Sequence, residues 1–169
     1  NKNLKTALAN HMVGVYGGSI QSNNVLISAG CNQAYCLATM ALAEAGDEII
    51  LPVPYYFNHQ MWLEVLGIKA VHLNCNMSQG GLPDIDEARR LIGKKTKAIV
   101  LVTPNNPTGA TYPPDLLRGF FKLCQKHGIK LIIDETYKDF LTEQPPHQLF
   151  EISDWGGTLI QVYSFSKCF

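Results

Sequence analysis

The end of the chain carries the residues best suited to covalent chemistry. Ser164, Ser166 and Lys167 occur together in the stretch Tyr-Ser-Phe-Ser-Lys at 163–167, directly after an apolar run at 158–162. An apolar strand that ends here places a primary amine beside hydroxyl groups able to hold an anion. Such an amine can react with an aldehyde. Because most lysines are solvated surface charges, the other polar clusters of the sequence decide whether Lys167 has this role.

Two further polar clusters follow expected strands. Gly30, Cys31 and Asn32 begin a helix after a small-residue turn, and the free N–H groups at a helix start favour a phosphate. The alternative is a simple turn with a helix cap. Asn106 lies in the segment 103–109, whose two prolines and glycine make a stiff turn able to direct an amide at a ligand. The alternative is an ordinary turn between a strand and a helix.

A carboxylate ends the apolar strand expected at 130–134. Asp134 is costly at the end of a buried strand unless it has a cationic or hydrogen-bonding partner, which makes it a candidate site residue. The alternative is that Asp134 caps the following helix. Its neighbour Glu135 is expected to be a solvated carboxylate, and Tyr137 adds a phenol to the same cluster.

Short apolar runs alternate with helical patterns along the chain. The runs are continuous rather than alternating, which is typical of strands buried on both faces. We therefore predict an α/β fold, a three-layer α/β/α sandwich with a mostly parallel sheet, in which ligands bind beyond the C-terminal strand ends. The helix at 30–45 is apolar on most sides and is expected to be buried between layers. The expected strands are 25–28, 49–51, 69–74, 97–102, 130–134 and 159–163, and the expected helices are 4–16, 30–45, 56–66, 84–92 and 113–127.

Composition narrows the class of protein. The 14 basic residues balance the 14 acidic ones, so no attraction to nucleic acid or to a membrane surface is expected. The longest strongly apolar stretch, 34–43, is too short to cross a bilayer. Five cysteines without a CxxC pair indicate reduced thiols in a cytoplasmic protein. The histidines form no ligand pattern, so no metal site is expected.

Together the clusters match the contacts that one cofactor needs. The aromatic pair Tyr55-Tyr56 offers a face for a planar ring, and the helix start and the serine hydroxyls suit a phosphate. A ring nitrogen that stays protonated needs a carboxylate, a ring oxygen needs donors such as an amide or a phenol, and an aldehyde needs an amine. This set of requirements describes pyridoxal 5′-phosphate.

Three motifs, in this order, resemble those of the fold-type I pyridoxal-phosphate enzymes, specifically the class I/II aminotransferases. They are Asn-Pro-x-Gly at 106–109, Asp-x-x-Tyr at 134–137 and Ser-x-Ser-Lys at 164–167. The resemblance covers nearly the whole chain. It implies a pyridoxal-phosphate-dependent aminotransferase that moves an amino group between an amino acid and a 2-oxo acid, and a homodimer. It also implies that residues 1–169 are a partial large cofactor-binding domain, with an N-terminal segment and a C-terminal small domain absent.

The resemblance gives catalytic roles to Lys167, Asp134 and Tyr137. Lys167 matches the lysine that forms the internal aldimine and later shuttles the substrate proton. Asp134 matches the carboxylate that pairs with the pyridinium nitrogen. Asn106 and Tyr137 match the donors to the phenolic oxygen of the ring.

The remaining matches concern cofactor binding. Tyr56 matches the aromatic residue that stacks on the ring. His59 falls where some family members have a histidine behind the cofactor aspartate, although an exposed helix residue fits the sequence equally well. The residues matched to the phosphate site are Gly30, Cys31, Asn32, Ser164 and Ser166.

Three other functions share parts of this pattern. A different fold-type I reaction, such as that of a C–S lyase or a cyclopropane-forming ACC-synthase-like lyase, uses the same motifs. The aminotransferase-like sensor domain of some transcription regulators would carry them without catalysis. An ATPase is disfavoured, because 130–135 looks like a Walker B strand but the sequence has no GxxxxGK[ST] loop.

Overall fold

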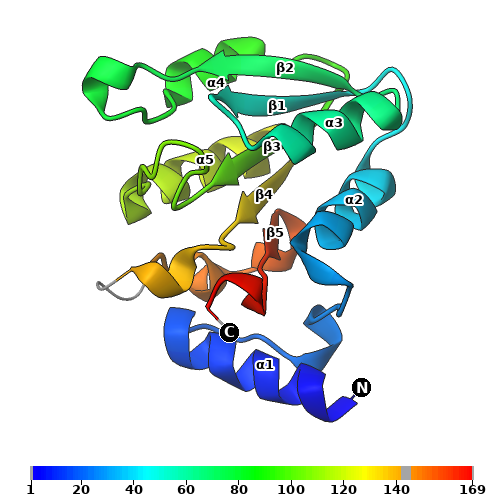
Figure 1. Ribbon diagram of the computed structural model, residues 1–169, viewed down its shortest axis with the longest axis vertical. Coiled ribbons are helices and arrows are strands. Elements are labelled where there is room, and N and C mark those ends of the chain that lie inside the picture. Colours follow the sequence, from blue (N-terminus) through cyan, green and yellow to red (C-terminus); the bar gives the residue numbers. More distant parts are fainter. Residues whose placement is uncertain (1, 142–145, 169) are drawn as a thin grey trace.

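A computed structural model describes residues 2–141 and 146–168 of the chain. Within these residues, five strands form one parallel sheet in the order β2-β1-β3-β4-β5 (Figure 1). The expected α/β fold with a parallel sheet is therefore confirmed. The strands are β1 (Glu48–Val53), β2 (Lys69–Asn74), β3 (Thr96–Val102), β4 (Lys130–Asp134) and β5 (Leu159–Val162).

Helices cover both faces of this sheet, which gives the three layers. The helices α4 and α5 pack against one face and α2 and α3 against the other. The N-terminal helix α1 lies near the C-terminus of the chain (Figure 1). The helices are α1 (Lys2–Tyr16), α2 (Gly30–Leu42), α3 (Phe57–Val65), α4 (Ile85–Leu91) and α5 (Pro114–His127). No helix in the described ranges is both long and apolar enough to span a bilayer.

The central strands explain the layering. Alternate side chains of β3 enter opposite cores: Ile99 and Leu101 pack with Phe120 of α5, whereas Ala98 and Val100 lie in the core beneath α2 and α3. All five side chains are fully buried. Burying one large apolar side chain stabilises a fold by about 1.5–3 kcal/mol, so this strand needs helices on both sides.

Register brings the C-terminal ends of three strands together. Val102 at the end of β3 pairs with Asp134 at the end of β4, and Asp134 pairs with Val162 at the end of β5. The loops that follow these strands therefore begin side by side at one edge of the sheet.

Two expectations about the N-terminal third are wrong. The segment 25–28 pairs with no strand of the described chain, and Leu26 and Ile27 are exposed. A run of β-branched and apolar residues forms a strand only where a neighbour completes its hydrogen bonds. The helix α2 is also not buried on most sides, because only the side that carries Tyr35 and Thr39 is fully covered.

Most helix and strand boundaries agree with the sequence-based ranges to within a few residues. Asp84 caps α4 as expected, accepting a hydrogen bond from the backbone N–H of Glu87 at 2.7 Å. Gly128 ends α5 with φ of 66°, a left-handed conformation that favours glycine. The loop expected at 143–155 contains short 3₁₀ turns, and its first three residues, 143–145, lie outside the described residues.

Candidate active site

One cavity of about 290 Å³ lies at the C-terminal edge of the sheet. It brings together the ten residues that the sequence analysis matched to catalysis or to direct contact with the cofactor, although these residues come from five separate segments; His59 lies outside the cavity wall. The other residues that line it are Ala29, Val102 and Thr136. The predicted residues in its wall are Gly30, Cys31, Asn32, Tyr56, Asn106, Asp134, Tyr137, Ser164, Ser166 and Lys167.

The first wall of the cavity is the N-terminus of α2. Gly30 has φ of +85°, which side-chain-bearing residues rarely adopt, so this turn requires glycine. Ala29 is the N-cap and provides no side-chain cap. Its own backbone N–H donates to the side chain of Gln33 at 2.6 Å. The first N–H groups of this 13-residue helix therefore remain available for an anion.

Asp134 forms the floor of the cavity. Its side chain is almost fully buried, with Oδ2 3.1 Å from Nε2 of His59 and Oδ1 accepting the N–H of Thr136 at 3.0 Å. Burial by itself raises the pKa of Asp134, but the hydrogen bonds from His59 and Thr136 outweigh it and hold the pKa below its ordinary value. Asp134 is therefore an ionised carboxylate at neutral pH.

His59 is not an exposed helix residue. It is buried behind Asp134, and its ring packs on Tyr35 with centroids 4.2 Å apart and planes 33° apart. The histidine thus supports Asp134 from the side opposite the cavity.

Asn58 is a further residue near this site that the sequence analysis missed. Its side-chain N–H groups donate to Asn32 Oδ1 at 3.1 Å and to the Tyr56 hydroxyl at 2.8 Å. It joins the helix start of α2 to the aromatic ring that follows β1. The only signal in the sequence is its position, two residues after Tyr56.

Asn106 is directed to the cavity by a locked turn. The neighbouring Asn105 is buried, and its side-chain oxygen accepts the backbone N–H and the hydroxyl of Thr108 at 3.2 and 2.8 Å. Gly109 donates its backbone N–H to the carbonyl of Asn105 at 2.7 Å. Asn105 therefore stabilises the turn, whereas Asn106 lines the cavity.

Lys167 lies at the end of a 3₁₀ turn, Phe165–Lys167, that follows β5. Ser164 starts this turn by accepting the backbone N–H of Ser166 at 3.2 Å, and the two serine hydroxyls are 2.9 Å apart. The Lys167 ammonium is exposed and lies 5.8 Å from the ring centroid of Tyr137. The amine and the phenol therefore share one side of the cavity.

Cys31 contributes a neutral thiol. Burial and the nearby charge of Asp134 raise the pKa of Cys31 to about 12. The thiolate is the reactive form of cysteine, so this residue is not a nucleophile at neutral pH.

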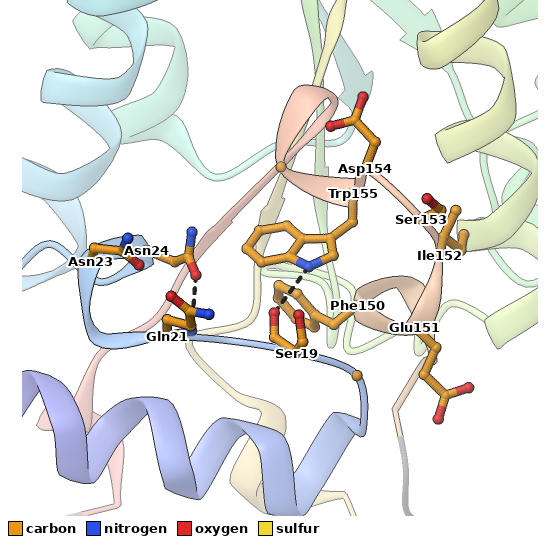
Figure 2. Close-up of a pocket in the computed structure, with 12 residues that line it drawn as sticks. Ser19, Gln21, Asn23, Asn24, Phe150, Glu151, Ile152, Ser153, Asp154 and Trp155 are labelled. Atoms are coloured by element: carbon orange, nitrogen blue, oxygen red, sulfur yellow. Dashed lines mark hydrogen bonds between the residues drawn. The ribbon is translucent and has the colours of Figure 1, made fainter.

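A larger cavity of about 640 Å³ contains none of the predicted residues. It lies between the segment after α1 and the residues around Trp155, whose indole N–H donates to the Ser19 carbonyl at 3.3 Å (Figure 2). Its charged lining residues are Glu151 and Asp154. It holds no group that could react with an aldehyde, so the smaller cavity is the candidate active site.

Comparison with known proteins agrees with the motifs. The family model described as aminotransferase class I and II matches residues 1–169. The chain belongs to this aminotransferase family. The family depends on pyridoxal 5′-phosphate and acts on amino acids and 2-oxo acids.

Individual class I/II aminotransferases are similar over most of the chain. It is 33% identical over 166 residues to an aspartate aminotransferase of Pyrococcus horikoshii, covering 98% of this chain and 42% of that protein. It is 31% identical to an aromatic aminotransferase of Arabidopsis thaliana, covering 89% and 38%. The solved alanine aminotransferase of Pyrococcus furiosus superposes with a TM-score of 0.89 at 30% identity, covering 99% and 42%. The chain therefore spans about two fifths of the length of these aminotransferases.

Proposed function

We propose that this chain is the cofactor-binding part of an enzyme that transfers an amino group between an amino acid and a 2-oxo acid with pyridoxal 5′-phosphate. The observation that carries the proposal is the single cavity that collects all ten predicted cofactor residues in a member of the aminotransferase family. The share of the relatives that the chain spans supports the view that it is a partial domain.

The residues of the cavity fit pyridoxal phosphate in charge and in hydrogen bonding. The uncapped start of α2 and the hydroxyls of Ser164 and Ser166 would hold the phosphate. Tyr56 would stack on the ring, and the ionised Asp134 would keep a proton on the ring nitrogen. The amide and phenol donors to the ring oxygen would be Asn106 and Tyr137.

Lys167 is proposed to bond the cofactor aldehyde and to carry the substrate proton. When bound, the cofactor supplies an aldehyde for Lys167 and a ring that withdraws electrons from the substrate Cα. The Lys167 amine, once released, would remove the Cα proton of the amino acid and later return it, acting as a base and then as an acid. The Tyr137 ring centroid lies 5.8 Å from the Lys167 ammonium, within the range of a cation–π contact.

Substrate choice is proposed only at the level of an amino acid and a 2-oxo acid. The names of the three relatives refer to aspartate, aromatic and alanine aminotransferases. Three amino acid classes thus occur among similar proteins, and no one of them is favoured by the residues in the cavity wall.

We include a homodimer in the proposal because of the outer face of α3. Phe57, Met61 and Val65 recur every four residues and are 61%, 52% and 74% exposed. Exposed apolar residues gathered on one helix face are typical of a protein interface. Light scattering on the natural protein that contains this chain would give its mass in solution, and a monomer at micromolar concentration would contradict this part.

The decisive test is the replacement of Lys167 in that natural protein. Lys167→Ala should abolish both the yellow absorbance of the bound cofactor and amino-group transfer, because no other amine among the cavity-lining residues can bond the aldehyde. Glu44→Gln, an exposed site on a distant loop, serves as a control that should keep both. Turnover by Lys167→Ala at a near-normal rate would overturn the proposal.

Product analysis separates transamination from a lyase reaction. Amino-group transfer requires a 2-oxo acid acceptor for repeated turnover, whereas elimination proceeds without one. Equal rates with and without the acceptor would indicate a lyase. Cofactor binding without turnover of any amino acid would indicate a sensor domain.

A further inference from the structure

A second carboxylate is buried next to Asp134, on the other side of the sheet. Glu135 is 0% exposed, which contradicts the expectation that it is solvated. Whereas Asp134 contacts His59 of α3, Glu135 contacts Tyr16 at the end of α1 and His147. An ionised carboxylate in such a position is costly unless several donors surround it.

Two hydrogen-bond donors and the ring of His147 converge on one oxygen of Glu135. The hydroxyl of Tyr16 donates to Oε2 at 2.9 Å, and the side-chain amide of Gln161 on β5 donates to the same atom. The Nε2 atom of His147 lies 3.3 Å from it. Burial and the charge of Glu135 raise the pKa of Tyr16, so its hydroxyl keeps its proton and remains a donor. Within the described chain, neither Glu135 Oε1 nor His147 Nε2 has a hydrogen-bond partner, so His147 contributes a close contact rather than a hydrogen bond.

The hydrogen bond at Nδ1 of His147 indicates that its Nε2 atom carries the ring hydrogen. The backbone N–H of Leu149 donates to Nδ1 of His147 at 3.3 Å, so Nδ1 is an acceptor and Nε2 carries the hydrogen. The His147 ring also packs on Tyr16, with centroids 4.6 Å apart. Glu135, Tyr16, His147 and Gln161 therefore form one buried network, named below the Glu135 network.

The backbone of Glu135 is held as firmly as its side chain. Its N–H donates to the carbonyl of Val162 on β5 at 2.9 Å, and its carbonyl accepts the N–H of Lys138 at 3.0 Å. The next N–H in the chain, that of Thr136, is the donor to Asp134 Oδ1. The orientation of the Glu135–Thr136 peptide therefore determines one of the hydrogen bonds that hold Asp134.

The network also spans the two strands that lead to the cavity. Glu135 follows β4, which ends in Asp134, whereas Gln161 lies on β5, three residues before Ser164 and six before Lys167. A side-chain hydrogen bond between these strand ends limits their relative movement. Catalytic groups displaced by about 1 Å can lose about 10²-fold in rate, so a tie at this point bears on function.

We propose that Glu135 is a positioning residue that fixes Asp134 and the Lys167 turn relative to each other through the Glu135 network. The inference rests on the proposed function, because it assigns Glu135 to the same cofactor site. Glu135 itself does not line the cavity and does not touch the reacting atoms.

Glu135→Gln in the natural protein tests this assignment. The amide keeps the shape, removes the charge, and replaces one of the two acceptor oxygens by an N–H₂ group, so Tyr16 and Gln161 lose their charged acceptor. We expect the dissociation constant of pyridoxal phosphate to rise about tenfold, the size of effect expected when a hydrogen bond to a charged group is weakened. We also expect the ¹⁵N signal of the cofactor ring nitrogen to move toward the unprotonated form, because Asp134 is held less well. Glu44→Gln, exposed and remote from the cavity, is the matched control and should change neither.

Tyr16→Phe is a second, milder variant for the case in which Glu135→Gln does not fold. It removes one hydroxyl from the network and leaves the ring contacts with His147 and Phe150 in place. We expect a change of the same kind and of about threefold, because one of the two donors to Glu135 is lost. A lower melting temperature with unchanged cofactor affinity and an unchanged ¹⁵N signal would make the network merely structural and would overturn the inference. If the unaltered protein does not bind the cofactor, the proposed function fails instead.

Discussion

The two sides of the β4 end contain nearly the same set of side chains with different access to the cavity. On one side Asp134 pairs with His59, whose ring packs on Tyr35. On the other side Glu135 pairs with His147, whose ring packs on Tyr16. Each side thus has a carboxylate, a histidine and a tyrosine, and both carboxylates are buried.

The difference lies in where the tyrosine hydroxyl and the cavity are. Tyr16 donates its hydroxyl to Glu135, and Gln161 adds a second donor, so the carboxylate is surrounded by protein. The Tyr35 hydroxyl is directed to the carbonyl of His59 at 3.5 Å instead, and Asp134 borders the cavity. A carboxylate–histidine pair can therefore serve two ends. Where protein donors surround the carboxylate it stabilises the fold, and where the carboxylate borders a cavity it can bind a ligand.

The largest expected effect comes from removing the charge that faces the cavity. Asp134→Asn in the natural protein should lower kcat/KM for amino-group transfer by about 10²–10³-fold, the size typical of losing one preorganised electrostatic partner. Glu135→Gln in the same assay should cost about tenfold, since it acts through Asp134. Equal losses in the two variants would remove the distinction between the two sides.

A smaller effect is expected on stability in acid. The pKa of Asp134 is below its ordinary value of 3.8 in the folded state. Its ionised form therefore stabilises the fold above pH 3.8, and this contribution is lost as the pH falls through the folded-state pKa. Chemical denaturation at a series of acid pH values should show a steeper loss of unfolding free energy for the unaltered protein than for Asp134→Asn. Parallel curves would contradict the pairing of Asp134 with His59.

The sequence predicted which residues meet at the cavity far better than it predicted the contacts of Glu135 on the other side of the sheet. Asp134, Asn106 and Lys167 each follow a continuous apolar run, and a parallel sheet brings such positions to one edge. That local rule brings Asp134, Asn106 and the Lys167 turn to one edge, whereas the assignment of the other residues depended on the resemblance to the aminotransferase motifs. The turn at Gly30 was also visible, because a small-residue segment precedes a helical pattern.

The opposite side depends on contacts between distant parts of the chain. Glu135 meets Tyr16, 119 residues away, and Gln161, 26 residues away. No local pattern distinguishes such a glutamate from a solvated one, so the sequence-based expectation was wrong. The segment 25–28 failed for a related reason, because strand propensity alone provides no neighbouring strand.

The side chain of Asn58 bears on how two parts of one ligand would contribute to its affinity. By donating hydrogen bonds to both Asn32 and Tyr56, it links the helix start proposed to bind the phosphate with the ring proposed to stack on the cofactor. Occupying one of these two linked parts restrains the other before the second half of a ligand arrives. Phosphate and ring would then contribute to affinity cooperatively, so that a phosphate-free analogue loses more than the phosphate contacts alone.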